Sequence, residues 1–254
     1  METVGIIAAM PQESNALLST IEQCKRSNLG PYHCYRFPLS DRDCWLLTSG
    51  MGIARAAQAT RALIDAANPQ MLVSIGIAGA VDADLEIGDV VASRTTCLLE
   101  KGLPGPFLPL ASLSEAAWGA AVQALQPRGA RLYHGTAVTT HGSQFVDHQP
   151  EQMPNPVLEM ETVGIAQVAA ERGIPLLSLR AISDGPRAPI PFNLDAVMDE
   201  EYNLRMREII KAVLSHPQML LQFRRMGRNT RKAAENAAMA LIAALSQPGP
   251  VLSK

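Results

Sequence analysis

The side chains best suited to acid–base chemistry lie in one stretch of the chain, residues 157–184. Two carboxylates, Glu159 and Glu161, come where a helical pattern begins, and a third, Asp184, follows a short apolar run that contains Arg180. Positioned carboxyl groups can donate a proton to a reacting atom or accept one from it. A single acid at a helix start can do no more than complement the helix dipole. Acids at both ends of one unit, with an arginine between them, favour a site.

The residues between these acids predict a helix followed by a buried strand. Ile165, Val168 and Ala169 recur at the spacing of one buried helix face, and Gly173 is placed to end that helix. The apolar run at 176–182 is typical of a strand covered on both faces. Open α/β sheets bind ligands beyond the carboxyl ends of such strands. The sequence therefore predicts a binding site where this strand ends.

The rest of the chain predicts further elements of the same kind, with no repeat or linker that would divide it. Residues 3–10 are apolar without alternation, which predicts a buried first strand, and Glu13 follows at the mouth of a helix. Taken alone, Glu13 is better explained as a favourable charge in a first helical turn. Strands are expected at 33–39, 44–48, 71–75, 85–92 and 131–139, and helices at 14–23, 54–66, 113–125, 195–214 and 218–244.

Composition excludes several classes of function. The formal net charge of −2 argues against a general nucleic-acid binder. Four cysteines without a Cys-x-x-Cys spacing favour a reduced, cytoplasmic setting. No apolar run approaches the roughly 20 residues of a membrane span. Because the five histidines are scattered, no metal site is expected. No cofactor is expected either.

Two glycine-containing segments follow predicted strands. The turn at 49–52 contains Met51 between two glycines, which would let the backbone approach a ligand closely. The segment 76–80 is a run of small residues, expected as a loop, and it has neither the Lys nor the Ser/Thr of a P-loop. It therefore does not indicate phosphate binding, although a flat ring could lie against it.

In this order, these motifs resemble the 5′-methylthioadenosine/S-adenosylhomocysteine nucleosidases and their purine nucleoside phosphorylase relatives. The resemblance covers roughly residues 3–200. The motifs that carry it are Gly-Ile-Ile-Ala-Ala-Met-Pro-Gln-Glu at 5–13, Ser-Gly-Met-Gly at 49–52, Gly-Ile-Ala-Gly-Ala-Val at 76–81, Leu-Glu-Ile-Gly-Asp-Val at 85–90, Glu-Met-Glu at 159–161 and Arg-Ala-Ile-Ser-Asp at 180–184. It implies a single α/β domain at 1–200, with a central mixed β-sheet flanked by helices. Residues 201–254 would be a C-terminal helical extension packed on the same domain.

The resemblance also implies roles for individual residues. Asp184 would protonate the purine as it leaves, Glu161 would hold the ribose hydroxyls, and Glu13 would orient or deprotonate the attacking water. The other residues expected to bind substrate are Met51, Ala78, Gly79, Phe145, Val146, Glu159, Met160, Arg180 and Ser183. The partner would be a nucleoside, and the protein a homodimer or a higher homo-oligomer.

Two positions depart from the family pattern. Ile77 stands where the family usually has a serine, and Ser74 stands where hexameric phosphorylases have an arginine. Without that cation we expect water, rather than phosphate, to be the nucleophile.

The C-terminal region is similar to the hopanoid-associated members of this family, which are linked to the release of adenine from adenosylhopane. Residues 218–244 predict an amphipathic basic helix, which suits peripheral contact with an anionic membrane. Packing of this helix on its own domain or on a partner subunit explains the pattern equally well. The expected function is release of adenine from a 5′-substituted adenosine of the adenosylhopane type. The alternatives are methylthioadenosine/S-adenosylhomocysteine nucleosidase, purine nucleoside phosphorylase and, less favoured, a non-catalytic nucleoside binder.

Overall fold

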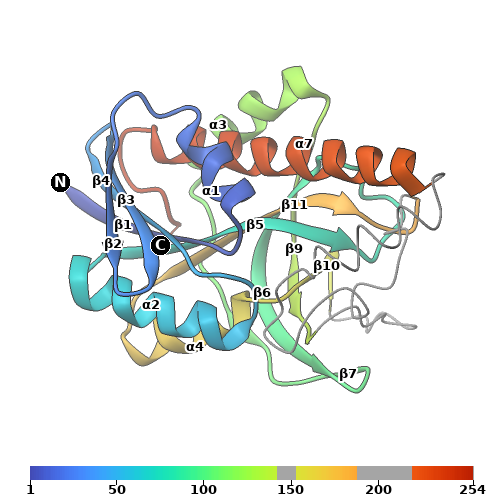
Figure 1. Cartoon of the computed structure of the whole chain (residues 1–254), viewed down its shortest axis with the longest axis horizontal. Helices are drawn as coiled ribbons and strands as arrows, with labels where there is room; N and C mark the ends of the chain where they lie inside the picture. The colour runs from blue at the N-terminus through green and yellow to red at the C-terminus, as the bar shows by residue number, and fades with distance from the viewer. Residues whose placement is uncertain (142–152, 188–218, 254) are drawn as a thin grey trace.

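A computed structural model of the chain describes residues 1–141, 153–187 and 219–253 (Figure 1). The β-strands are β1 (Glu2–Ala8), β2 (Lys25–Leu29), β3 (Tyr32–Leu39), β4 (Arg42–Thr48), β5 (Met71–Ala80), β6 (Val90–Glu100), β7 (Leu103–Pro104), β8 (Leu108–Pro109), β9 (Leu132–Thr139), β10 (Pro156–Glu159) and β11 (Leu176–Asp184). The helices are α1 (Pro11–Leu18), α2 (Ile53–Ala67), α3 (Glu115–Leu125), the 3₁₀ helix η1 (Gln126–Arg128), α4 (Thr162–Glu171) and α7 (Met219–Leu245).

The strands form one mixed sheet along the path β10-β9-β6-β11-β5-β1-β4-β3-β2, and the short strands β7 and β8 pair with β6 beside this path. Strands β1, β4, β5 and β11 run parallel, so their carboxyl ends lie at one edge. Strand β10 is parallel to β9 and also pairs antiparallel with β5, which closes β5, β11, β6, β9 and β10 into a ring. Because β10 runs against β5, the residues after β10 lie beside the middle of β5. This closure decides where the acids after β10 are placed.

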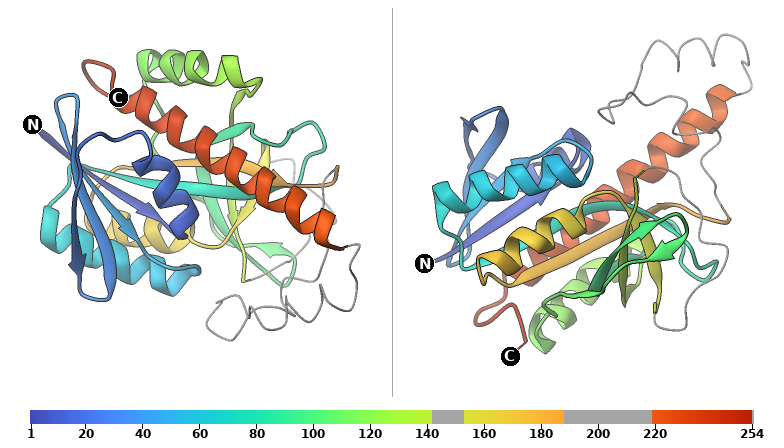
Figure 2. Two further views of the ribbon diagram at one scale, coloured as in Figure 1. Left: turned by 45° about the horizontal axis from the view of Figure 1, so that its top comes forward. Right: turned by 90° about the horizontal axis from the view of Figure 1, so that it is seen from below.

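Helices cover both faces of the sheet, as expected for its buried strands (Figures 1 and 2). Helices α2 and α4 pack together over one face, where the buried cluster includes Leu63, Ile165 and Val168. Helices α1, α3 and α7 cover the other face. Successive side chains of a strand point to opposite faces. Strand β5 therefore gives Val73 and Ile75 to the α7 side.

Local sequence explains where several elements begin and end. Ser114 caps α3 by accepting a hydrogen bond from the backbone N–H of Ala117. Helix α2 ends at Asn68, which has a left-handed backbone conformation and is followed by Pro69. Asn accepts that conformation more readily than most residues because its short polar side chain bonds locally.

The structure confirms the α/β fold with a central mixed sheet and corrects some expected elements. Residues 76–80 belong to β5 and are not a loop. Helix α1 ends at Leu18, and residues 25–29 form an edge strand that the sequence did not indicate. The expected helix at 195–214 lies outside the described residues.

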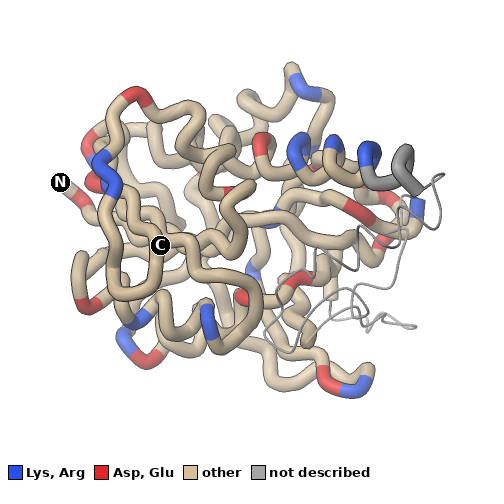
Figure 3. The backbone as a smooth tube through the Cα atoms, viewed as in Figure 1, with Lys and Arg blue, Asp and Glu red and all other residues tan. Residues whose placement is uncertain are grey.

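The C-terminal helix α7 packs on the same domain over its second half. Ala233, Ala237 and Leu241 are buried against the sheet, as the amphipathic pattern predicts. Arg224, Arg228 and Arg231 are exposed on the first half of the helix. Figure 3 shows basic positions recurring along this part of the chain. In the described part of the chain, no helix is both long and apolar enough to cross a membrane.

Candidate active site

The centre of the candidate site is a buried ion pair between Glu159, the last residue of β10, and Arg180 in β11. Arg180 Nη2 lies 2.7 Å from Glu159 Oε2 and also donates to Ser74 Oγ at 2.8 Å and to Thr162 Oγ1 at 3.0 Å. Burial works against the charge of Arg180, but nearby glutamates outweigh it and raise the pKa of the guanidinium group. Arg180 is therefore held charged in the interior.

Glu159 accepts hydrogen bonds from protein groups on both carboxylate oxygens. Its Oε2 accepts from the backbone N–H groups of Glu161 and Thr162, at 3.0 and 2.8 Å, and from Thr162 Oγ1. Its Oε1 accepts from Thr139 Oγ1. These hydrogen bonds suit a residue that holds Arg180 and the start of α4 in place. Direct contact of Glu159 with substrate stays a prediction.

Glu161, the N-cap residue of α4, is buried between the 49–52 turn and Arg180. Its Oε1 accepts a hydrogen bond of 3.0 Å from the backbone N–H of Gly52, and its Oε2 lies 3.7 Å from Arg180 Nη2. Burial raises the pKa of Glu161 to about 7; Arg180 opposes the rise, and the negative charges of Glu159 and Glu13 add to it. Glu161 can therefore change its protonation state near neutral pH.

Glu13, in the first turn of α1, bridges β1 and β5. Its carboxylate accepts hydrogen bonds from the backbone N–H groups of Ala9, Met10 and Ile77, at 2.9, 2.8 and 2.9 Å. Burial nevertheless raises its pKa, because the favourable charge of Arg180 and these N–H groups offset only part of the desolvation. A side chain at Gly76 would overlap Arg180 and Glu13, so glycine is required there.

Ile77 contributes to this site through its backbone. Its N–H donates to Glu13, while its side chain packs against the cluster on the α7 side of the sheet. A hydroxyl side chain with the same direction would also point away from Glu13. Because this contact is made by the backbone N–H, any residue other than proline at this position can keep it.

Asp184 ends β11 and faces β5 at a different point from the glutamates. It pairs in register with Gly79, where an added Cβ would lie 2.7 Å from Asp184 Oδ2. The hydroxyl group of Ser183 donates to Asp184 Oδ1 at 2.6 Å. Burial raises the pKa of Asp184, and the bond from Ser183 works in the opposite direction. The acid therefore holds its proton to a higher pH than an exposed aspartate does.

The remaining residues predicted from sequence fall into two groups. Ala78 is buried on β5 between the Glu13 and Asp184 contacts. Met51, which precedes Gly52, and Met160, which precedes Glu161, are both half-buried. Phe145 and Val146 lie outside the described residues. Within the described ranges, no His, Cys, Asp and Glu side chains gather in a group that could hold a metal ion.

Sequence reasoning missed the hydroxyl groups that surround the ion pair. Thr139 on β9, Thr162 on α4 and Ser74 on β5 are all fully or almost fully buried and bond to Glu159 or Arg180. The available signal was weak: each is a polar residue in an otherwise apolar strand or at a helix start, which local capping also explains.

A polar connection also links helix α7 to the strand that ends at Asp184. Asn236 Nδ2 donates to the carbonyl oxygen of Gly88 at 2.7 Å, and its Oδ1 accepts from Arg128 Nε. The N–H of Gly88 donates to the carbonyl oxygen of Ile182, and the N–H of Ile182 donates to that of Asp89. The end of β11 is therefore held from α7 through the 86–89 turn.

The chain is similar to known proteins over most of its length. A family model described as the Phosphorylase superfamily matches residues 3–215. The 5′-methylthioadenosine/S-adenosylhomocysteine nucleosidase of Glaesserella parasuis serovar 5 is 30% identical over 199 residues, covering 71% of this chain and 85% of that protein. The enzyme of the same name from Desulfotalea psychrophila is 29% identical over 205 residues, covering 72% and 85%.

Solved structures show the same fold. A 5′-methylthioadenosine/S-adenosylhomocysteine nucleosidase from Colwellia psychrerythraea, solved in complex with adenine, superposes with a TM-score of 0.70 at 22% identity and covers 99% of this chain and 98% of that one. Futalosine hydrolase of Helicobacter pylori gives a TM-score of 0.67 at 19% identity and covers 95% and 96%.

The chain therefore belongs to the phosphorylase superfamily. It is an enzyme that cleaves N-glycosidic bonds, in the class of nucleosidases and nucleoside phosphorylases.

Proposed function

We propose that the enzyme hydrolyses the N-glycosidic bond of a 5′-substituted adenosine and releases adenine. The observation that carries this proposal is the arrangement of the acids along β5 and β11. Asp184 lies four residues beyond Arg180 on β11, a distance of roughly 13 Å along a strand. Asp184, an acid with a raised pKa, is therefore separated from the glutamates and Arg180. The glycine and alanine residues of β5 lie between the two groups.

The base is expected to leave at the Asp184 end. A purine anion is a poor leaving group, and protonation of a ring nitrogen by a nearby acid makes it a neutral one. Asp184 has a raised pKa, and no side chain at Gly79 would obstruct the close approach of a flat ring. As the bond breaks, its electron pair goes to the base, and the proton of Asp184 goes to the base nitrogen.

The sugar is expected to bind at the glutamate end, where negative charge stabilises an oxocarbenium-like transition state. Glu161 would accept hydrogen bonds from the ribose hydroxyls, with Met160 packed beside the sugar. Glu13 would take a proton from the attacking water, whose oxygen forms the new bond to the anomeric carbon. The products are then adenine and a 5′-substituted ribose.

Electrostatics favour water over phosphate as the nucleophile. Among the described residues, Arg180 is the arginine that lies within ion-pair distance of Glu159 and Glu161. Its charge is already paired with that of Glu159. A phosphate dianion placed beside three glutamates would be strongly repelled. The Nε atom of Arg180 is buried without a hydrogen-bond partner in the described structure, and a water molecule could satisfy it.

Product analysis tests this proposal. Methylthioadenosine, S-adenosylhomocysteine and adenosine would each be incubated with the enzyme, with and without phosphate, and the products separated chromatographically. We expect free adenine and a free ribose product at the same rate in both buffers. A sugar 1-phosphate, or a rate that requires phosphate, would show that the enzyme is a phosphorylase.

For the 5′ substituent we propose a large apolar group of the adenosylhopane type, met at an anionic membrane surface. Exposed cations on the first half of α7 support this proposal, as does Leu103, which is 72% exposed at the tip of the β7 segment. Phe107, Leu108 and Leu110 do not support it, because they pack against the protein's own core clusters. Homo-oligomer formation and peripheral membrane contact both remain proposals.

Two measurements separate this substrate from methylthioadenosine. The first compares kcat/KM for 5′-alkylthioadenosines of increasing chain length, where each buried CH₂ is expected to add about 0.8 kcal/mol of binding. The second measures binding to phosphatidylglycerol vesicles before and after Arg224 and Arg228 are changed to glutamine. Equal activity on methylthioadenosine and no vesicle binding would leave the ordinary nucleosidase as the better assignment.

A further inference from the structure

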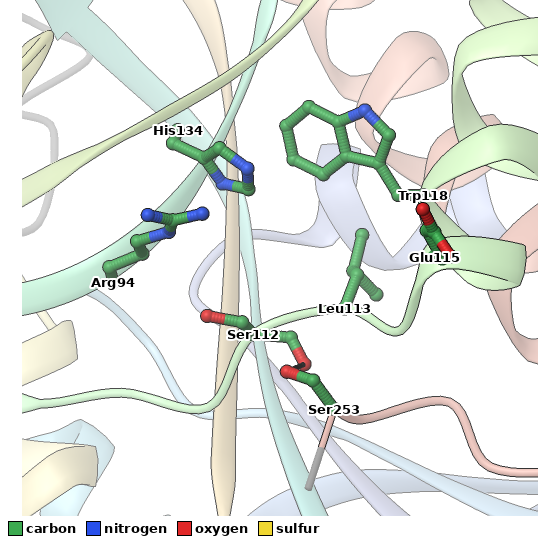
Figure 4. Close-up of a pocket in the computed structure, with 7 residues that line it drawn as sticks. All are labelled: Arg94, Ser112, Leu113, Glu115, Trp118, His134 and Ser253. Carbon is green, nitrogen blue, oxygen red and sulfur yellow. Dashed lines mark hydrogen bonds between the residues drawn. The ribbon is translucent and has the colours of Figure 1, made fainter.

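A cavity of about 480 Å³ lies on the α3 side of the sheet, and none of the acids discussed above lines it (Figure 4). Its walls come from β6, β9, the start of α3 and the C-terminal segment. The residues that line it are Arg94, Ser112, Leu113, Glu115, Trp118, His134 and Ser253. Nothing in the proposed reaction uses these side chains.

The backbone of β6 is irregular at the residue that supplies the cation. Strands β6 and β9 pair in register up to Ser93 and again from Thr95, so Arg94 is the extra residue of a β-bulge. Bulges turn a side chain out of the regular alternation of a strand. The guanidinium group of Arg94 has no ion pair or hydrogen bond among the residues that the structure describes, and Figure 4 shows it close to the ring of His134.

His134 and Trp118 stack on each other along one wall of the cavity, beside Arg94 (Figure 4). Their ring centroids are 3.9 Å apart with an angle of 29° between the ring planes. The Nδ1 atom of His134 is buried and has no hydrogen-bond partner in the described part of the chain. Burial lowers the pKa of His134, and the positive charge of Arg94 lowers it further. An anion placed beside Arg94 and His134 would offset the repulsion between the positive charge of Arg94 and a protonated His134.

We propose that this cavity is a second binding site, which takes a small organic anion. Its carboxylate or phosphate group would bind Arg94, beside the His134 ring and the hydroxyl group of Ser112, whereas the hydroxyl group of Ser253 already donates to the carbonyl oxygen of Ser112. Its flat apolar body would lie against Trp118. Glu115 lies across the cavity from Arg94 in Figure 4, which leaves the Arg94 end for the anionic group. The site does not depend on the reaction proposed for the acids of β10 and β11.

Tryptophan fluorescence tests this proposal directly, because the chain has two tryptophans and one of them, Trp118, lines the cavity. In the Trp45→Phe variant, Trp118 is the sole reporter. Benzoate, phenyl phosphate and inorganic phosphate would be titrated separately, which distinguishes a carboxylate from a phosphate ligand. We expect a saturable change with benzoate or phenyl phosphate. The same titration of Trp118→Phe in the otherwise native chain should give no such change.

Arg94→Gln provides the decisive comparison, with Arg61→Gln as the matched control. Arg61 is also exposed but lies on α2, where it pairs with Glu171. Loss of a charged hydrogen bond to the anion should weaken binding about tenfold or more in Arg94→Gln and leave it unchanged in Arg61→Gln. Equal affinity in the two variants, no saturable signal with any of the probes, or a response to inorganic phosphate alone would overturn the proposal.

Discussion

Glu159 Oε2 lies 2.7 Å from Arg180 Nη2, and each of the two side chains is only 1% exposed. The pair joins β10 to β11 across the ring of strands. Because water is excluded, each charge depends on the other and on the hydroxyl and N–H groups around them. The pKa values of Glu13 and Glu161 also depend on this pair, because the positive charge of Arg180 works to lower both.

Removal of one partner of this pair should therefore destabilise the protein strongly. Glu159→Gln leaves the buried guanidinium group of Arg180 without its carboxylate, and the expected loss is about 3–5 kcal/mol in the free energy of unfolding. Urea denaturation followed by circular dichroism measures it. The control is Glu171→Gln, which breaks an exposed pair with Arg61 and should cost less than about 1 kcal/mol. Similar losses in both variants would contradict a structural role for the buried pair.

Asp184→Asn should lower turnover by about 10²–10⁴-fold while substrate binding largely survives, because the amide cannot donate the acid's proton to the leaving base. Single-turnover kinetics and equilibrium binding of a substrate analogue separate the two effects. Asp65→Asn, at an exposed carboxylate on α2 that pairs with Arg172, is the control and should retain full turnover. Near-normal turnover in Asp184→Asn would remove this residue from the mechanism.

The protonation of Glu161 should govern the acidic side of the pH profile. If its carboxylate accepts hydrogen bonds from the ribose, kcat/KM should rise with pH and level off above about 7, where the carboxyl group has lost its proton. Glu161→Gln should lower kcat/KM and remove this rise. The measurement is kcat/KM from pH 5 to 9, and a wild-type profile that is flat between pH 6 and 8 would count against the assignment.

The same group should affect stability in the opposite direction. Its pKa is raised from 4.5 in the unfolded chain to about 7 in the folded one. Between these values the folded protein holds a proton that the unfolded chain has released, so the free energy of unfolding decreases as the pH rises through this window. Urea denaturation at several pH values should show a steeper decrease for the wild type than for Glu161→Gln. Parallel curves would indicate that Glu161 titrates near its ordinary value.

Asn236 is not among the residues proposed to contact substrate, but Asn236→Ala should still slow the reaction. The change removes the bonds to Gly88 and Arg128, which is expected to cost about 1–3 kcal/mol of stability and to loosen the end of β11. We expect kcat to fall more than KM rises. Asn229→Ala, two turns earlier on α7, is the matched control. Equal kinetics in the two variants would show that the 86–89 turn holds β11 without help from α7.

The local pattern of residues was enough to predict the elements that carry chemistry. The apolar run at 176–182 is strand β11, and the motif after it places Asp184 at the end of that strand. The hairpin of β3 and β4 and the helices α2, α3 and α4 also follow from periodicity and turn residues, because these signals are local. Strand β2 carries no such signal, since most of its residues are exposed at the sheet edge.

The sequence by itself determined the kind of chemistry: four acids and one arginine in motifs of a family that cleaves N-glycosidic bonds. Only the tertiary structure decided which of these groups lie together and which lie apart. Strand β10 has four residues and pairs with both β9 and β5, and this long-range pairing brings Glu159 onto Arg180 and Glu161 onto Gly52. The direction of Ile77 was likewise set by its place in β5. Such contacts depend on which strands become neighbours, and spacing along the chain does not encode that.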